Sequence, residues 1–240
     1  MRRLAILPWC MATAVAVAAA PPAATPVPAP APDPQHQLAP SADLNEPGKH
    51  KVPEEMQKIS KRAIAELGNG KLDAARQDFL KVLESVPDNV PTMINLGLVE
   101  FRSKNLEAAE KRLQGAVRLA PDTALGWLIL GIVQYERSRY DHALASLAQA
   151  AVLDPKNAMV HQYLGVTIGQ KGWYSGAEEE MRKAIEIDPD YAEAHFNLAV
   201  FYLQRTPPAI ELARRHYQKA LELGAAPDPE VEKSLTLPKP

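Results

Sequence analysis

Apolar residues recur at steps of three and four in two neighbouring stretches near the middle of the chain. The first stretch carries Leu125, Leu128, Ile132 and Tyr135, and the second carries Leu144, Leu147, Ala148 and Ala151. This spacing is typical of one face of an α-helix. Pro155 follows the second stretch and ends it, because a proline has no N–H with which to continue the helical hydrogen bonds. The pattern predicts two consecutive helices that end before Pro155.

The same pattern returns every 34 residues. Prolines 87, 121, 155 and 189 share this spacing, and so do three ladders of apolar residues and a Leu-Gly pair. The ladders are Ala75, Ala109, Ala143 and Ala177; Val82, Ala116, Ala150 and Ala184; and Phe79, Leu113, Leu147 and Met181, while the pair ends at Gly97, Gly131 and Gly165. A fixed period of this length predicts a solenoid of helical hairpins, since one hairpin cannot bury its own apolar faces. The expected blocks are 56–89, 90–123, 124–157, 158–191 and 192–225.

One block carries enough of the pattern to suggest a family. Between Ala124 and Asn157 it contains Trp127, Leu130, Gly131, Tyr140, Ala143, Leu147, Ala150 and Pro155. This block resembles the tetratricopeptide repeat (TPR) family, and the resemblance extends over roughly residues 56–223. It implies an all-α, right-handed superhelical solenoid of about five helix–turn–helix repeats with a concave inner face. The domain is therefore expected to span 56–225.

The two ends of the repeat region depart from the pattern. Lys61, Arg62 and Glu66 crowd the first helix, as expected of an N-terminal cap that faces water. The turn at 206–208 (Thr-Pro-Pro) shifts the second helix of the fifth block by two residues. Asp228, Pro229 and Glu230 then form a helix-start signal, which predicts a short capping helix within 226–240.

The N-terminal segment predicts export. Arg2 and Arg3 precede an uncharged stretch that ends in small residues, so residues 1–20 are typical of a secretory signal peptide. An uncleaved membrane anchor is the alternative, and the expected location is periplasmic or extracellular. The Pro/Ala-rich residues 21–55 are expected to be a disordered, extended linker that holds the repeats away from their surroundings.

Composition narrows the classes of function. The 27 Lys and Arg residues nearly balance the 29 Asp and Glu residues, which argues against a nucleic-acid binder. The single cysteine, Cys10, excludes a disulfide framework and a cysteine-based zinc site. No catalytic or cofactor motif is found, and residues 68–71 (Gly-Asn-Gly-Lys) are interpreted as a turn. His161 and His195 are 34 residues apart, and both occupy the repeat position that Trp127 occupies in its block. The favoured role of these histidines is packing, and metal binding is the alternative.

The resemblance also implies which residues line the groove. They are the fifth, ninth and twelfth residues of a block: Ile94, Leu98 and Phe101; Leu128, Ile132 and Tyr135; Gln162 and Val166, with Gly169 leaving a shallow gap; and Phe196, Val200 and Leu203. Arg102, Glu136, Gln170 and Gln204 are expected at the rim. The residues at these positions predict an exposed apolar stripe, which usually marks a partner site. In the alternatives, the side chains merely pack neighbouring helices, or the Pro/Ala tail folds back into the groove.

Taken together, the sequence predicts a non-catalytic scaffold or assembly factor of the cell envelope. Its partner is expected to be an amphipathic helix or an extended apolar segment of a protein, with no cofactor, metal or small-molecule substrate. The alternatives are a repeat module held in the membrane by its N-terminus and a self-associating structural protein.

Overall fold

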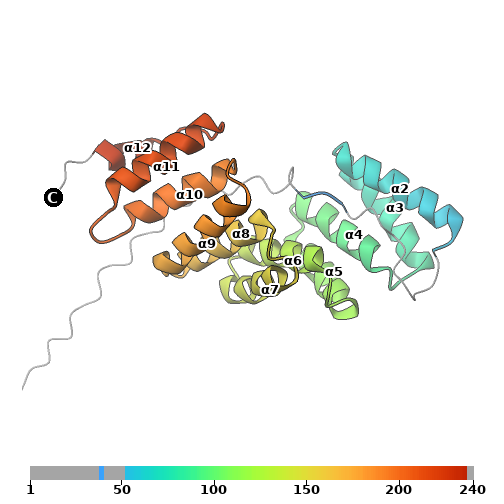
Figure 1. Cartoon of the computed structure of the whole chain (residues 1–240). Coiled ribbons are helices and arrows are strands. Elements are labelled where there is room, and N and C mark those ends of the chain that lie inside the picture. Colours follow the sequence, from blue (N-terminus) through green and yellow to red (C-terminus); the bar gives the residue numbers. More distant parts are fainter. Residues whose placement is uncertain (1–37, 41–51, 237–240) are drawn as a thin grey trace, which may run out of the picture.

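The computed structural model describes residues 38–40 and 52–236 (Figure 1). The expected signal peptide, Cys10 and most of the expected linker lie outside these residues. Within them the chain is all-α and contains no strand, as predicted. The helices are α2 (Glu54–Gly68), α3 (Leu72–Ser85), α4 (Val90–Arg102), α5 (Leu106–Leu119), α6 (Ala124–Glu136), α7 (Tyr140–Leu153), α8 (Ala158–Gln170), α9 (Tyr174–Ile187), α10 (Ala192–Leu203), α11 (Ile210–Glu222) and α12 (Pro229–Thr236).

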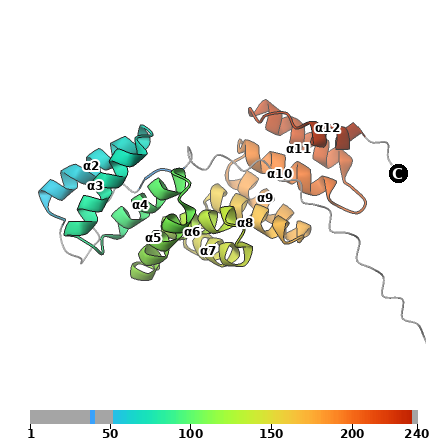
Figure 2. The ribbon, with the colours of Figure 1, turned by 180° about the vertical axis from the view of Figure 1, so that it is seen from behind.

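The helices form five hairpins that stack in a row. Each first helix (α2, α4, α6, α8 and α10) packs against the second helix of its own pair, and successive first helices also contact each other. Each of α3, α5, α7 and α9 in turn contacts the first helix of the following pair. Figures 1 and 2 show the row running from α2 and α3 at one end to α10 and α11 at the other. The predicted solenoid with a short C-terminal cap is therefore confirmed.

The glycine ladder marks a close approach of the two helices in the second, third and fourth hairpins. A methyl group added to Gly131 of α6 would lie 2.6 Å from Leu147 Cγ of α7 and 3.3 Å from the Leu147 backbone nitrogen. The same clash would arise between Gly97 and Leu113, and between Gly165 and Met181. One ladder of large apolar residues thus fills the space that the glycine ladder leaves, as the 34-residue spacing predicts.

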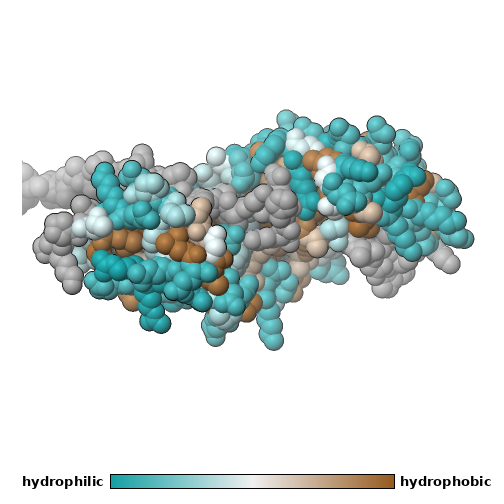
Figure 3. All heavy atoms as spheres, turned by 90° about the horizontal axis from the view of Figure 1, so that it is seen from above, coloured by the Kyte–Doolittle hydropathy of each residue, from teal (hydrophilic) through white to brown (hydrophobic). Residues whose placement is uncertain are grey.

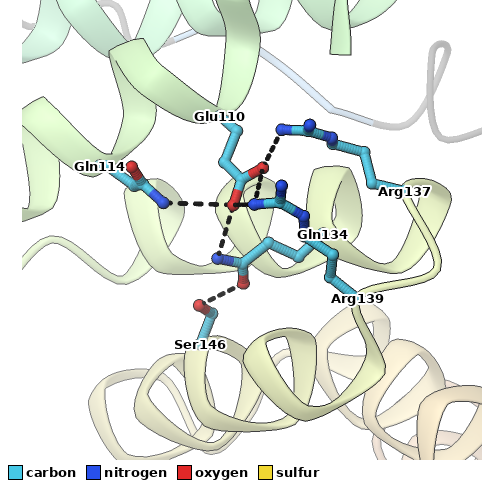
Figure 4. A network of polar contacts seen from close by, with 6 residues as sticks. All are labelled: Glu110, Gln114, Gln134, Arg137, Arg139 and Ser146. Atoms are coloured by element: carbon cyan, nitrogen blue, oxygen red, sulfur yellow. Dashed lines mark hydrogen bonds and ion pairs between the residues drawn. The ribbon is translucent and has the colours of Figure 1, made fainter. Parts of the chain in front are cut away.

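Polar bridges join successive hairpins at the second helices. Glu110 of α5, only 2% exposed, accepts hydrogen bonds from Arg137, Arg139 and Gln134, which belong to the next hairpin (Figure 4). Ser146 donates to Gln134 at 2.7 Å and extends this network. Equivalent bridges at the other junctions are Arg76 to Ser103 (2.7 Å), Lys171 to Asp141 (2.7 Å) and Arg205 Nε to Glu178 (2.7 Å).

The two ends of the solenoid are covered differently. At the C-terminus, Asp228 Oδ1 accepts from the backbone N–H groups of Glu230 (2.9 Å) and Val231 (3.1 Å), so the predicted helix start is confirmed. The buried side chains of Val231 and Leu235 pack α12 against the solenoid. At the N-terminus, Leu38 is 3% exposed and belongs to the core. The expected linker therefore contains a buried leucine that no periodic pattern in the sequence indicates.

No helix among the described residues combines the length and apolar character needed to cross a bilayer.

Candidate partner-binding surface

The groove residues predicted from the repeat frame lie on the first helices, but most are not exposed. Nine of the eleven side chains are at most 5% exposed: Ile94, Leu98, Phe101, Leu128, Ile132, Gln162, Val166, Phe196 and Val200. The expectation of an exposed apolar stripe is therefore wrong. Neighbouring first helices pack directly on one another; Ile94 Cδ1, for example, lies only 3.4 Å from where Gly126 of α6 would carry a Cβ. Whether these residues also contact a partner stays a prediction.

The expected gap at Gly169 is absent. The ring of Phe201, from α10, fills it so closely that a methyl group on Gly169 would lie 2.5 Å from the ring edge. The gap was predicted because glycine has no side chain. The repeat pattern could not show that an aromatic residue of the next hairpin fills this space.

The accessible part of the predicted groove lies at the last turns of the first helices. Tyr135 and Leu203 are half-buried, as are the four rim residues Arg102, Glu136, Gln170 and Gln204. Gln170 donates to the Tyr135 hydroxyl at 3.4 Å, and burial raises the pKa of Tyr135. The Tyr135 ring also meets Tyr163 of α8 edge-to-face at 6.3 Å. We use the term inner face for the eleven predicted groove residues together with these four rim residues.

Two buried amides on these helices have no hydrogen-bond partner. Both side-chain polar atoms of Gln162, on α8, and of Asn197, on α10, are fully buried and unpaired. The Tyr163 hydroxyl beside Gln162 is also unpaired, and burial raises the pKa of this phenol. A buried polar group without a partner costs about 1–3 kcal/mol. Gln162 was predicted as a groove residue. Asn197 and Tyr163 were not predicted as groove residues, because each comes directly after a predicted groove position.

The two histidines of the frame have a structural role that they share with Trp127. The Trp127 Nε1–H donates to the Pro121 carbonyl at 2.8 Å. In the next two hairpins His161 Nε2 lies 3.0 Å from the Pro155 carbonyl, and His195 Nε2 lies 3.1 Å from the Pro189 carbonyl. Histidine can replace tryptophan here because each ring places an N–H within hydrogen-bonding distance of the proline carbonyl six residues earlier. The two histidines do not contact each other.

The second ring nitrogens of these histidines have different partners. His161 Nδ1 lies 2.7 Å from Glu180 Oε2, whereas His195 Nδ1 lies 2.9 Å from His216 Nδ1 of α11. Because the Pro189 carbonyl only accepts, the Nε2 of His195 carries its proton, and His216 donates the Nδ1 hydrogen bond when both rings are neutral. Among the described residues no three His, Cys, Asp or Glu side chains are placed to hold a metal ion.

The His195–His216 pair borders a cavity of about 500 Å³ between α9, α10 and α11. The two rings stack at 5.2 Å, and Arg215 and Lys219 line the same cavity. Burial, and then the neighbouring His195, lower the pKa of His216 to about 4; burial also lowers the pKa of His195. His216 was missed from the sequence because the two-residue shift of the fifth block moves it out of the frame.

The exposed apolar residues lie elsewhere. Within the described ranges the large exposed apolar side chains come from the second helices or from the turn before α9: Leu119, Val152, Trp173, Ile187 and Leu212. The face seen in Figure 3 is mostly hydrophilic, with apolar atoms in narrow stretches. The first helices therefore use most of their apolar residues in packing against neighbouring helices.

Family comparison agrees with the stacked hairpins. The family described as tetratricopeptide repeat matches residues 60–111 and 94–158, and a TPR repeat family matches residues 169–205. The chain belongs to the tetratricopeptide repeat family, as the resemblance implied. A search of curated proteins found no match.

Solved structures of several TPR proteins share the fold. A crystal structure of MamA has a TM-score of 0.61 and 25% identity, covering 67% of this chain and 93% of that one. MamA from Desulfovibrio magneticus RS-1 has a TM-score of 0.65 and 17% identity, covering 72% and 97%. YrrB, described as a TPR protein with an unusual peptide-binding site, has a TM-score of 0.59 and 21% identity, covering 72% and 87%.

Proposed function

We propose that this protein is an exported, non-catalytic scaffold or assembly factor that binds an extended segment of a partner protein along its inner face. Family membership supports a role in protein interaction, and YrrB gives an example of peptide binding by a TPR protein of similar fold. Export is supported by the arginine pair and the uncharged stretch at the start of the sequence.

The observation that carries this proposal is the pair of unpaired amides, Gln162 and Asn197. Each amide has both donor and acceptor atoms, and a peptide bond offers the complementary acceptor and donor. A helical partner already satisfies its own backbone groups internally, whereas an extended segment leaves them free. The amides therefore favour an extended segment over an amphipathic helix. Since both side chains are buried in the free chain, binding must part the side chains that cover them.

Charged substitutions on the inner face would not test this proposal. Leu128 and Ile132 are 3% and 0% exposed, so a carboxylate at either position would be buried and would unfold the hairpins. Gln162→Met is the sharper variant, because methionine keeps the length and helix propensity of glutamine but removes both polar atoms. Gln77→Met, at an exposed glutamine of α3, is the matched control.

The test is in-cell crosslinking followed by identification and quantification of the captured proteins. We expect the wild-type chain and Gln77→Met to capture the same partner at equal yield, and Gln162→Met to capture at least tenfold less at unchanged helical circular dichroism. Equal capture by all three chains would refute the assignment to the inner face.

The location is tested separately by cell fractionation and the N-terminal mass of the purified protein. A mature chain that lacks residues 1–20 and appears in the periplasm or the medium is the expected result. An intact N-terminus in the membrane fraction would instead support the anchored alternative.

A further inference from the structure

A short segment outside the repeats is packed against the first two hairpins. Residues 38–40 precede α2, yet the Leu38 side chain is buried in the same core cluster as Leu67 and Phe101. Figure 1 shows this segment, coloured blue, beside the end of α4. The linker therefore touches the repeat domain well before the chain enters α2.

Arg102 holds this segment through its backbone. The Arg102 Nη2 donates to the Leu38 carbonyl at 2.9 Å, and its Nη1 donates to the Leu67 carbonyl at 3.2 Å. The Leu67 carbonyl belongs to the last turn of α2, and it also accepts from the Gly70 backbone N–H at 3.2 Å. Arg102 is also the rim residue of α4. A single guanidinium thus joins the linker to the end of α2 at the edge of the inner face.

The chain is long enough to return to this point. The 15 residues of α2 span about 22 Å. The thirteen residues between Pro40 and Glu54 reach roughly 43 Å when fully extended. Val52 is 1% exposed, and its carbonyl accepts from Gln57 Nε2 at 2.7 Å, so the far end of this connection is also fixed. The number of residues between Pro40 and α2 is therefore sufficient for Leu38 to lie at the end of α2.

The contact has the character of a bound peptide. One apolar side chain is buried, one backbone carbonyl accepts a hydrogen bond, and the next residue, Ala39, is exposed. The buried leucine is not part of any repeat ladder. These are the two kinds of contact, an apolar anchor and a backbone hydrogen bond, by which an extended segment is recognised.

We propose that the segment around Leu38 is an intramolecular ligand of the inner face at its N-terminal end. The tether gives this segment an effective concentration in the millimolar range, so it competes with any peptide that enters the same end. This role as a competitor rests on the proposed function. The chain blocks part of its own binding surface until a partner displaces Leu38.

The test uses the full chain and a fluorescent synthetic peptide of residues 33–43. Three proteins are compared: wild type, Leu38→Asp, and the matched control Ala39→Asp, which places the same charge at the exposed neighbour. Binding of the peptide is measured by fluorescence anisotropy up to millimolar protein. A second peptide that itself carries Leu38→Asp reports non-specific binding. Leu38→Ala is the fallback if the aspartate variant loses helical circular dichroism.

We expect the peptide to bind Leu38→Asp at least tenfold more tightly than it binds wild type or Ala39→Asp, and the substituted peptide to bind none of them. Hydrogen exchange should also quicken in the last turns of α2 and α4 in Leu38→Asp alone. Equal binding to all three proteins, or no binding to Leu38→Asp with unchanged exchange, would overturn the proposal. No outside partner is used, so this outcome is independent of the capture experiment with Gln162→Met.

Discussion

Replacing Gln162 by methionine should stabilise the free protein. The Gln162 side chain on α8 is fully buried, and neither its oxygen nor its nitrogen has a hydrogen-bond partner. In the unfolded chain the same amide is hydrogen-bonded to water, so folding removes those bonds without replacing them. Methionine fills a similar volume and carries no such group.

The size of the effect follows from the desolvation of the amide. An unpaired buried polar group costs about 1–3 kcal/mol, and glutamine and methionine have similar helix propensities. Allowing for imperfect packing of the methionine, we expect the free energy of unfolding to rise by about 1–2 kcal/mol. For a chain of this size that corresponds to an increase in Tm of roughly 2–8 °C.

The assay is urea denaturation followed by circular dichroism, with Gln134→Met as the control. Gln134 is also buried, at 3% exposed, but its amide donates to Glu110 at 3.4 Å and accepts from Ser146 at 2.7 Å. Its replacement leaves both groups without this partner, so the control should lose about 1–3 kcal/mol. The two substitutions are chemically identical and should act in opposite directions.

A loss of stability in Gln162→Met comparable with that of the control would refute the reasoning. It would mean that the amide is satisfied in solution, for example by an ordered water. The unpaired amide would then no longer support recognition of an extended peptide.

Three further outcomes follow from the same structure. Gly131→Ala should lower the urea midpoint by the equivalent of about 1–2 kcal/mol, since its methyl group would press on α7, whereas Gly68→Ala, with no atom within 4 Å, should gain up to about 1 kcal/mol. Glu110→Gln should cost about 2 kcal/mol by the same assay, because two arginines lose the buried carboxylate that pairs with them; unchanged stability would contradict the bridge. The pKa of His216 lies at about 4, below its ordinary 6.5, so the folded chain binds fewer protons than the unfolded chain between these values. Stability should therefore fall by about 1–2 kcal/mol as the pH drops through this window, and thermal melts of His216→Gln should lose most of that dependence while His195 retains a smaller one.

The fold could be predicted because its information is periodic. Residues such as Gly131 and Leu147 recur in the same frame, and each pair meets in the structure as the spacing requires. Proline 155 and its equivalents end the second helices for a local reason that a sequence shows directly. A repeat protein therefore reveals its architecture through many weak signals that agree.

The candidate site could be predicted only in part. The repeat pattern indicates which helix position a residue occupies, but not how closely neighbouring helices pack around it. Ile94 was placed correctly on a first helix, but the close approach of α6 that buries it depends on the packing of two hairpins. Leu38 carries no periodic signal, so its burial was not predictable. The bridge from Glu110 to Arg137 did leave a trace, since Glu178 and Arg205 repeat the same pair two blocks later.

The helix that covers the last hairpin limits how copies of this protein can join. α12 lies on α11, where a sixth hairpin would otherwise place its first helix, and Arg214 donates to the Leu235 carbonyl at 2.9 Å. A head-to-tail filament needs an open edge at both ends of each copy, and this edge is closed. An assembly through the opposite edge would pair α2 with α2 about a two-fold axis, and such growth stops at a dimer.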